Sequence, residues 1–219
     1  MKTNRIIKIV PILLLAAVAI YITLAFTYLS KNKSLPIYNP IDLNPELVDA
    51  SLGNIKKNHI VSNFKLINQN GEIITEKTYK DKIYVVDFFF SSCPTICPIM
   101  TDNMAKIQNE FLNNDKIMML SLSVTPDIDS IPRLKSYAQR NGVIDSKWNV
   151  TTGDKKHIYE LARKSYFATT DEGDGGLQDF IHTSNFILID GDKQIRGIYD
   201  GIKDEEILRL IDDINILSN

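Results

Sequence analysis

The chain has 219 residues, a formal net charge of −2 and a mildly acidic pI of about 5.9. This length suits one globular domain plus an appendage. Because basic residues are not in excess, we expect no nucleic-acid partner.

The first predicted element is a transmembrane anchor over residues 9–29, which are uncharged and mostly aliphatic. About 20 apolar residues are enough to cross a bilayer as a helix. Residues 1–8 would form a short cytoplasmic N-terminus, because slightly more basic residues precede the span than follow it. A signal peptide ending at Ala17-Val18-Ala19 is the alternative, but the apolar stretch continues well beyond that site. We therefore expect a single-pass anchor in a bacterial-type inner membrane, with the remaining chain facing the periplasm.

Residues 30–55 are expected to form an extended linker, because their prolines disfavour helix. Strand and helix patterns then alternate over 56–219, the predicted folded domain. The predicted strands are 61–67 and 72–75 around an Asn70-Gly71 turn, 83–90, 116–124, 185–190 and 194–199. The predicted helices are 98–113, 131–141, 155–164 and 205–217. This order predicts an α/β fold, a thioredoxin-like mixed sheet flanked by helices.

The two cysteines of the chain, Cys93 and Cys97, directly follow the apolar strand 83–90. Pro98 suits the first position of a helix, which makes Cys97 the expected N-cap residue; a helix start at Pro94 is the alternative. The helix dipole favours negative charge at this end, so we expect both thiols to have a lowered pKa. Such thiolates either exchange with a disulfide or bind a soft metal.

The spacing of the cysteines is one residue wider than in a Cys-x-x-Cys oxidoreductase motif. Helical neighbours four positions apart have Cβ atoms about 5–6 Å apart, whereas a disulfide needs about 3.5–4.5 Å. The spacing therefore favours a metal, without excluding a disulfide, since irregular backbone can close the gap.

Two thiolates seldom complete a metal site, so a histidine ligand is expected among the three in the chain. His59 and His157 are interpreted as surface residues, because they lie near the linker and at the charged start of a helix. His182 stands in the loop before a late strand, which in a thioredoxin-like sheet lies against the cysteine loop. Neutral imidazole beside two thiolates suits Cu(I), Cu(II) or zinc, so His182 is the predicted third ligand.

Four segments form a specific combination: DFFFSSCPTICP at 87–98, LSVTPDIDSIP at 122–132, WNVTTG at 148–153 and DFIHTS at 179–184. Together with the anchor and linker they resemble the Sco/SenC family, membrane-anchored copper proteins that help to assemble cytochrome c oxidase. The resemblance covers residues 56 to the C-terminus. It implies a thioredoxin-like fold and one copper ion bound by Cys93, Cys97 and His182.

The chain departs from that family at two positions. Many members carry an acidic residue between the cysteines, where this chain has Thr95, and Asp before the histidine, where it has Ile181. Both changes remove negative charge near the metal. They affect the expected affinity for Cu(II) and the docking surface, but not the ligand set.

Asp87 interrupts an otherwise apolar strand six residues before Cys93, the offset at which thioredoxins keep a buried acid. A buried carboxyl has a raised pKa and can accept the proton that a cysteine loses, which makes Asp87 a candidate proton relay. The alternative is a carboxyl bonded to backbone at a strand end. Met100 and Met104, spaced at one helical turn, are interpreted as core residues rather than copper ligands.

Three functions fit these features. The first is delivery of copper to the binuclear copper site of cytochrome c oxidase, with the copper-bearing oxidase subunit or another copper protein as partner. The second is a thiol–disulfide oxidoreductase in which Cys93 and Cys97 form the redox pair. The third is a redox sensor, because an exposed thiol of low pKa is readily oxidised. A thiol reductant is a further expected partner, because copper loading requires a reduced pair.

Overall fold

The structure is a computed structural model that describes residues 14–24, 34–42, 59–169, 176 and 179–218. The chain divides into two compact units, Met1–Ser34 and Leu35–Asn219. In the first unit, residues 14–24 are helical and exposed. No helix among the described residues has the length and apolar character needed to cross a membrane. The predicted span 9–29 extends beyond the described residues, and the predicted terminus 1–8 lies outside them.

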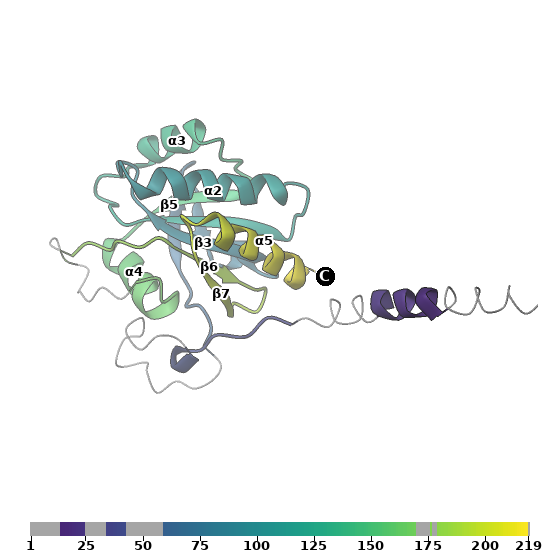
Figure 1. The fold of residues 1–219 in the computed structure, drawn as a ribbon. Helices are drawn as coiled ribbons and strands as arrows, with labels where there is room; N and C mark the ends of the chain where they lie inside the picture. Colours follow the sequence, from purple (N-terminus) through teal and green to yellow (C-terminus); the bar gives the residue numbers. More distant parts are fainter. Residues whose placement is uncertain (1–13, 25–33, 43–58, 170–175, 177–178, 219) are drawn as a thin grey trace, which may run out of the picture. The chain divides into compact units, whose positions relative to one another are not determined.

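One mixed sheet of seven strands forms the centre of the described part of the second unit (Figure 1). The spatial order of its strands is β2-β1-β5-β4-β3-β6-β7. The three central strands run parallel, whereas the other neighbours pair antiparallel. Parallel strands need crossover connections and antiparallel strands permit hairpins, so this topology confirms the predicted thioredoxin-like sheet. The strands are β1 (Lys65–Asn68), β2 (Ile73–Thr75), β3 (Ile83–Phe89), β4 (Ile117–Ser123), β5 (Trp148–Thr152), β6 (Asn185–Ile189) and β7 (Ile195–Asp200).

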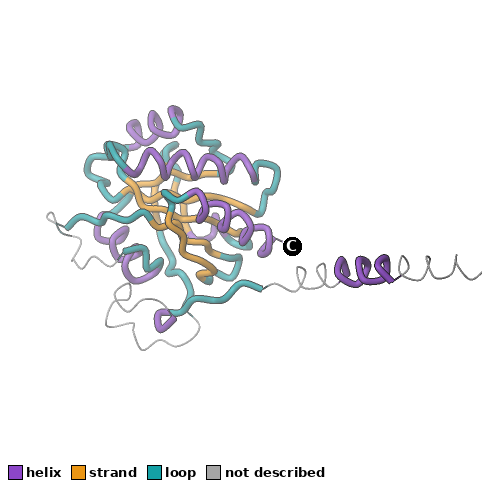
Figure 2. The backbone as a smooth tube through the Cα atoms, viewed as in Figure 1, coloured by secondary structure: helices purple, strands orange, loops and turns teal. Residues whose placement is uncertain are grey.

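Helices cover both faces of the sheet (Figures 1 and 2). One buried core lies beneath α2 (Ile96–Glu110), α3 (Ile131–Arg140) and α5 (Asp204–Ser218). The core on the opposite face lies against α4 (Lys155–Glu160) and the short helix η3 (Glu76–Tyr79). Met100 and Met104 of α2 are fully buried in the first core, which confirms their interpretation as core residues.

β3 leads into the cysteine loop, and all of its residues are buried. Successive residues of a strand face opposite sides of the sheet. Val85 and Phe89 belong to the core beneath α2, whereas Val86 and Phe88 belong to the core on the other face. By this alternation Asp87 faces the same side as Val85 and Phe89, the side that carries the cysteines.

Two predicted helices, 98–113 and 155–164, have different boundaries in the structure, and the predicted strand 61–67 begins later, at Lys65. The predicted helix 98–113 begins at Ile96 with Thr95 as its N-cap, so Cys97 is not the cap and Pro98 is the third helical residue. Proline is tolerated there because the first N–H groups of a helix have no intrahelical acceptor. The predicted helix 155–164 ends as an α-helix at Glu160 and continues as the π-helical turn η4 (Leu161–Ser165).

Part of the predicted linker belongs to the second unit and contacts β7. Leu35 is buried, and the Tyr38 amide donates to the Ile195 carbonyl over 2.9 Å. The short helix η1 (Pro40–Asp42) follows. The predicted boundary between linker and domain falls within residues 43–58, which the structure does not describe, and it stays a prediction.

Candidate metal centre and redox-active cysteines

The loop that carries Cys93 is held by a buried carboxylate at the end of β3. Asp129 is fully buried and accepts hydrogen bonds from the amide and the hydroxyl of Ser91. It also accepts from Ser123, the last residue of the neighbouring strand β4, and from Thr125 just after that strand. The Cys93 amide then donates to the Phe90 carbonyl over 3.1 Å. Hydrogen bonds from two adjacent strand ends thus fix the chain just before the first thiol.

The two thiols lie together at the start of α2. The Cys97 amide donates to the Cys93 Sγ over 3.5 Å, and the Thr95 Oγ1 lies 3.7 Å from the same sulfur. Both cysteines are free thiols and both are buried, with 9% of Cys93 and 4% of Cys97 exposed. Thr95, at the position where many members of the Sco/SenC family are expected to carry an acidic residue, contacts the first sulfur through its hydroxyl.

The two thiols differ in acidity. Burial opposes ionisation of Cys93, but hydrogen bonds from the Cys97 and Thr95 backbone and side chains outweigh it and lower its pKa to about 7. Burial raises the pKa of Cys97 to about 12, and the neighbouring sulfur of Cys93 and carboxyl of Asp87 add to the rise. The expectation of a lowered pKa is confirmed for Cys93 and wrong for Cys97, because only Cys93 receives the hydrogen bonds of the helix start.

Asp87 is buried beneath this pair. It accepts a short hydrogen bond from the Ser121 hydroxyl on β4, and the same hydroxyl accepts from Trp148 Nε1 over 2.8 Å. Burial raises the pKa of Asp87 to about 7, even though the Ser121 hydrogen bond opposes the rise. A carboxyl of this pKa can hold or release a proton at neutral pH beside Cys97.

A pocket of about 190 Å³ gives access to both cysteines from the side of α3. Phe90 and Pro98 also line it, together with Tyr137 and Arg140 of α3. The Tyr137 hydroxyl lies 2.5 Å from the Thr101 hydroxyl, which in turn donates to the Cys97 carbonyl over 2.7 Å. The thiols are therefore buried but can be reached by a small molecule or a side chain of a partner.

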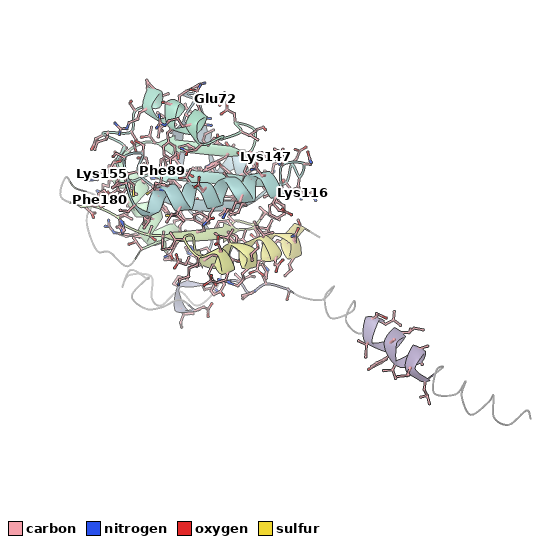
Figure 3. All side chains as sticks on the ribbon, turned by 45° about the horizontal axis from the view of Figure 1, so that its top comes forward. Glu72, Phe89, Lys116, Lys147, Lys155 and Phe180 are labelled. Carbon is pink, nitrogen blue, oxygen red and sulfur yellow. The ribbon has the colours of Figure 1, made fainter. Side chains whose placement is uncertain are left out.

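The loop that carries His182 lies against the cysteine loop. The ring of Phe180 packs edge-on against Phe90, with centroids 5.3 Å apart, and Ile181 is buried. Figure 3 shows Phe180 at the same edge of the domain as Lys155. His182 itself is exposed. No three His, Cys, Asp or Glu side chains among the described residues are gathered into a group that could hold a metal.

The donor atoms nevertheless fit copper. Two thiols already lie together, and thiolate sulfur with imidazole nitrogen is a ligand set that copper accepts. In the described part of the structure, the His182 loop lies beside the cysteine loop, but the three donor side chains do not form one group.

The interpretation of His59 as a surface residue was wrong. Its side chain is buried, its Nε2 lies 2.8 Å from the Ser165 carbonyl oxygen, and its ring packs on Phe167 at 4.6 Å. Burial also lowers the pKa of His59. His157 is partly buried at the start of α4 and accepts a bond from the Lys65 amide over 3.4 Å. None of these contacts of His59 and His157 involves a cysteine.

Several residues around the site were not predicted. Ser121 and Trp148 support Asp87, and Asp129 holds the cysteine loop. Their positions depend on pairing between β3, β4 and β5, which local patterns do not reveal. For Ser121 the available signal was a polar residue within an apolar strand, since buried polar groups are almost always paired.

A family model described as SCO1/SenC matches residues 53–215. The structure is similar to a SCO1/SenC family lipoprotein from Bacillus anthracis, with 32% identity and a TM-score of 0.65, covering 74% of this chain and 96% of that chain. It is also similar to BsSco, described as a cytochrome c oxidase assembly protein with a disulfide switch. That match has 30% identity and a TM-score of 0.63, covering 74% of this chain and 95% of that chain.

A copper-bound structure of Bradyrhizobium japonicum ScoI shares the fold, with 23% identity and a TM-score of 0.55, covering 72% of this chain and 97% of that chain. The family model spans most of the folded domain, and the motifs at the cysteines and at His182 lie within it. The chain therefore belongs to the SCO1/SenC family.

Proposed function

We propose that this chain binds copper through Cys93, Cys97 and His182 and assists metallation of the binuclear copper site of cytochrome c oxidase. The observation that carries the proposal is the packing of Phe180 on Phe90, which sets the His182 loop beside two adjacent thiols. Membership in the Sco family, in which BsSco is described as an oxidase assembly protein and ScoI has copper bound, supports this role.

Cys93, Cys97 and Asp87 would have different roles in copper binding. Cysteine binds copper as the thiolate, so both thiols must lose protons. The pKa of Cys93 is lowered to about 7, so this thiol ionises more readily than an ordinary cysteine at neutral pH. The pKa of Cys97 is raised, and Asp87 is the nearby carboxyl that would take its proton. Bound copper would supply the positive charge that keeps both sulfurs ionised. Three protein ligands leave the metal reachable, so a partner can take it by stepwise exchange of ligands.

Thiol–disulfide exchange is the second candidate function, and the unequal acidity of the two thiols favours it. The Cys93 thiolate would attack a partner disulfide and form a mixed disulfide while one partner sulfur leaves as thiolate. Cys97 would then lose its proton to Asp87 and attack Cys93, which closes the internal disulfide and releases the second partner thiol. The partner is reduced by two electrons and the cysteine pair is oxidised, so a thiol reductant must restore the pair.

We further propose that residues 9–29 anchor the chain in a bacterial-type inner membrane, with the folded domain in the periplasm. The B. anthracis relative is described as a lipoprotein. This chain has cysteines only at Cys93 and Cys97, so a lipid on a cysteine beside the apolar segment is not available to it. Anchoring would instead rely on the apolar segment itself.

The test measures Cu(I) binding by the reduced full chain in detergent, in competition with a chromogenic Cu(I) chelator. We expect one copper per chain, and a loss of affinity of about 100-fold or more in His182→Ala, beyond the 10–100-fold typical of outer-shell partners. His157→Ala is the matched control and should leave the affinity unchanged. Equal affinity of the parent and His182→Ala would reject the three-ligand site. Disulfide formation should be unaffected by either histidine substitution.

A further inference from the structure

The base of the His182 loop is held by a buried ion pair. Arg163, in the π-helical turn η4, donates two parallel hydrogen bonds to the carboxylate of Asp179, each 2.7 Å long. Only 11% of the Arg163 side chain and 6% of the Asp179 side chain are exposed. A bidentate ion pair of this kind fixes the relative orientation of the two side chains as well as their distance. Asp179 stands three residues before His182, so the pair fixes the start of the loop.

Two residues of α4 also contact the backbone carbonyl of Asp179. Lys155 Nζ donates to the Asp179 carbonyl over 2.9 Å, and the Tyr159 hydroxyl donates to it over 3.2 Å. The same hydroxyl lies 2.9 Å from the Val124 carbonyl at the end of β4. The Arg163 guanidinium also lies 5.3 Å from the centre of the Tyr159 ring. Side chain and backbone of Asp179 are therefore both held by α4 and η4.

The C-terminal end of the His182 loop is held by the chain segment that follows η4. After η4 the chain passes through Phe167, whose φ of 50° is rare for a bulky residue. The next carbonyl, of Ala168, accepts hydrogen bonds from the Thr183 hydroxyl over 2.6 Å and from Asn185 Nδ2 over 2.9 Å. π-Helical turns often occur at functional sites. Here the irregular backbone brings one continuous segment to both sides of His182.

We propose that Arg163 and Asp179 are positioning residues for His182, acting with Ala168 and Thr183 to hold both ends of its loop at the cysteine pair. The inference rests on the proposed role of His182 as a copper ligand. Between the two anchored ends lie only Phe180, Ile181 and His182, and Ile181 is buried. A movement of His182 towards the sulfurs would then involve only these three residues. Without the anchors, binding would have to order a longer segment, at an entropic cost.

The test is a double-mutant cycle on Cu(I) affinity in the full chain. Arg163→Lys keeps the positive charge but loses the bidentate hydrogen bonds. It should weaken Cu(I) binding about 10-fold, a loss typical of mutations in residues that support metal ligands. In a His182→Ala background the same change should have almost no further effect, because the pair acts through His182. Arg196→Lys is the matched control, since Arg196 forms an equally short 2.7 Å pair with Asp190 at the far end of β6. It should leave copper binding unchanged.

A second readout needs no copper. Amide hydrogen exchange at residues 180–184 should accelerate in Arg163→Lys, while alkylation of Cys93 keeps its rate. Thr183→Val tests the other anchor and substitutes for Arg163→Lys if that variant does not fold. Unchanged copper affinity in the anchor variants, or an equal loss in the His182→Ala background, would overturn the inference. A parent chain that loses no affinity on His182→Ala would instead overturn the proposed three-ligand site.

Discussion

The two halves of the proposed copper site differ in how they are built. The cysteine half is buried and preassembled: Cys93 and Cys97 lie at the start of α2, joined by a hydrogen bond from the Cys97 amide. The histidine half is exposed, and His182 stands in a short loop anchored at Asp179 and Thr183. The proposed thiol exchange would use the first half alone, whereas the proposed copper binding would also need the second half.

This difference separates the two candidate functions by residue. Dithiol exchange needs two adjacent sulfurs of unequal acidity, which β3 and α2 provide. The proposed metal binding would also need the His182 ring beside the sulfurs. Substitutions in the cysteine half should therefore affect both functions, and substitutions in the histidine half should affect copper alone.

The largest effect is expected from Cys93→Ser or Cys97→Ser. Each removes a soft donor, so Cu(I) affinity should fall by more than about 100-fold, beyond the loss typical of outer-shell changes. The internal disulfide also becomes impossible. Met100→Leu is the control, because Met100 is fully buried in the core and the exchange conserves volume. Copper titration and thiol counting measure both losses. Tight copper binding by either serine variant would show that the cysteine half is not the metal site.

The acidity of the two thiols can be compared by alkylation of the reduced chain. The Cys93 rate should rise with pH through about 7 and level off above it, because the thiolate is the nucleophile. Because Cys93 is buried, the midpoint of this rise, rather than the absolute rate, reports its pKa. Cys97 should react far more slowly over the same range. Mass spectrometry of the alkylated peptides distinguishes the two sites, and a Cys93 midpoint near 9 would contradict the assignment.

Asp87→Asn should change how stability depends on pH. The folded-state pKa of Asp87 is raised to about 7, so the native state keeps a proton that the unfolded state loses near pH 4. The stability that this group contributes is complete below pH 4 and declines as the pH rises to 7. The asparagine variant should lack that decline, which amounts to a few kcal/mol. Urea unfolding at pH 4.5 and 7.5 measures it, and parallel behaviour of the two proteins would exclude a buried protonated Asp87.

The smallest effect is expected from Phe180→Leu, which removes the aromatic contact with Phe90 but keeps an apolar side chain. Such contacts contribute about 0.5–1.5 kcal/mol, so Cu(I) affinity should fall only a few-fold. The alkylation rate of Cys93 should stay the same, because the cysteine half is untouched. A slower or faster reaction of Cys93 would mean that the two halves are not independent.

Features that depend on local sequence could be predicted. The buried strand β3, the Asn70-Gly71 hairpin and the adjacent cysteines follow from apolar runs and turn residues. β5 was missed because its polar residues, among them Asn149 and Thr151, obscure the strand pattern. They are buried, and hydrogen bonds to Tyr79 and Ser121 satisfy them.

Features that depend on distant contacts could not be predicted. The Arg163–Asp179 pair joins residues across a loop, and neither residue stands in a pattern that distinguishes it from a surface charge. His59 was misjudged for the same reason, since its acceptor Ser165 lies more than a hundred positions away. The raised pKa of Cys97 also follows from burial beside Asp87 rather than from its helical position.

The most direct test of the copper site is X-ray absorption spectroscopy of the reduced, Cu(I)-loaded full chain. The proposed site predicts two sulfur neighbours and one imidazole nitrogen, and loss of the nitrogen signal in His182→Ala. A spectrum with sulfur neighbours alone, or a nitrogen signal that persists in His182→Ala, would contradict it.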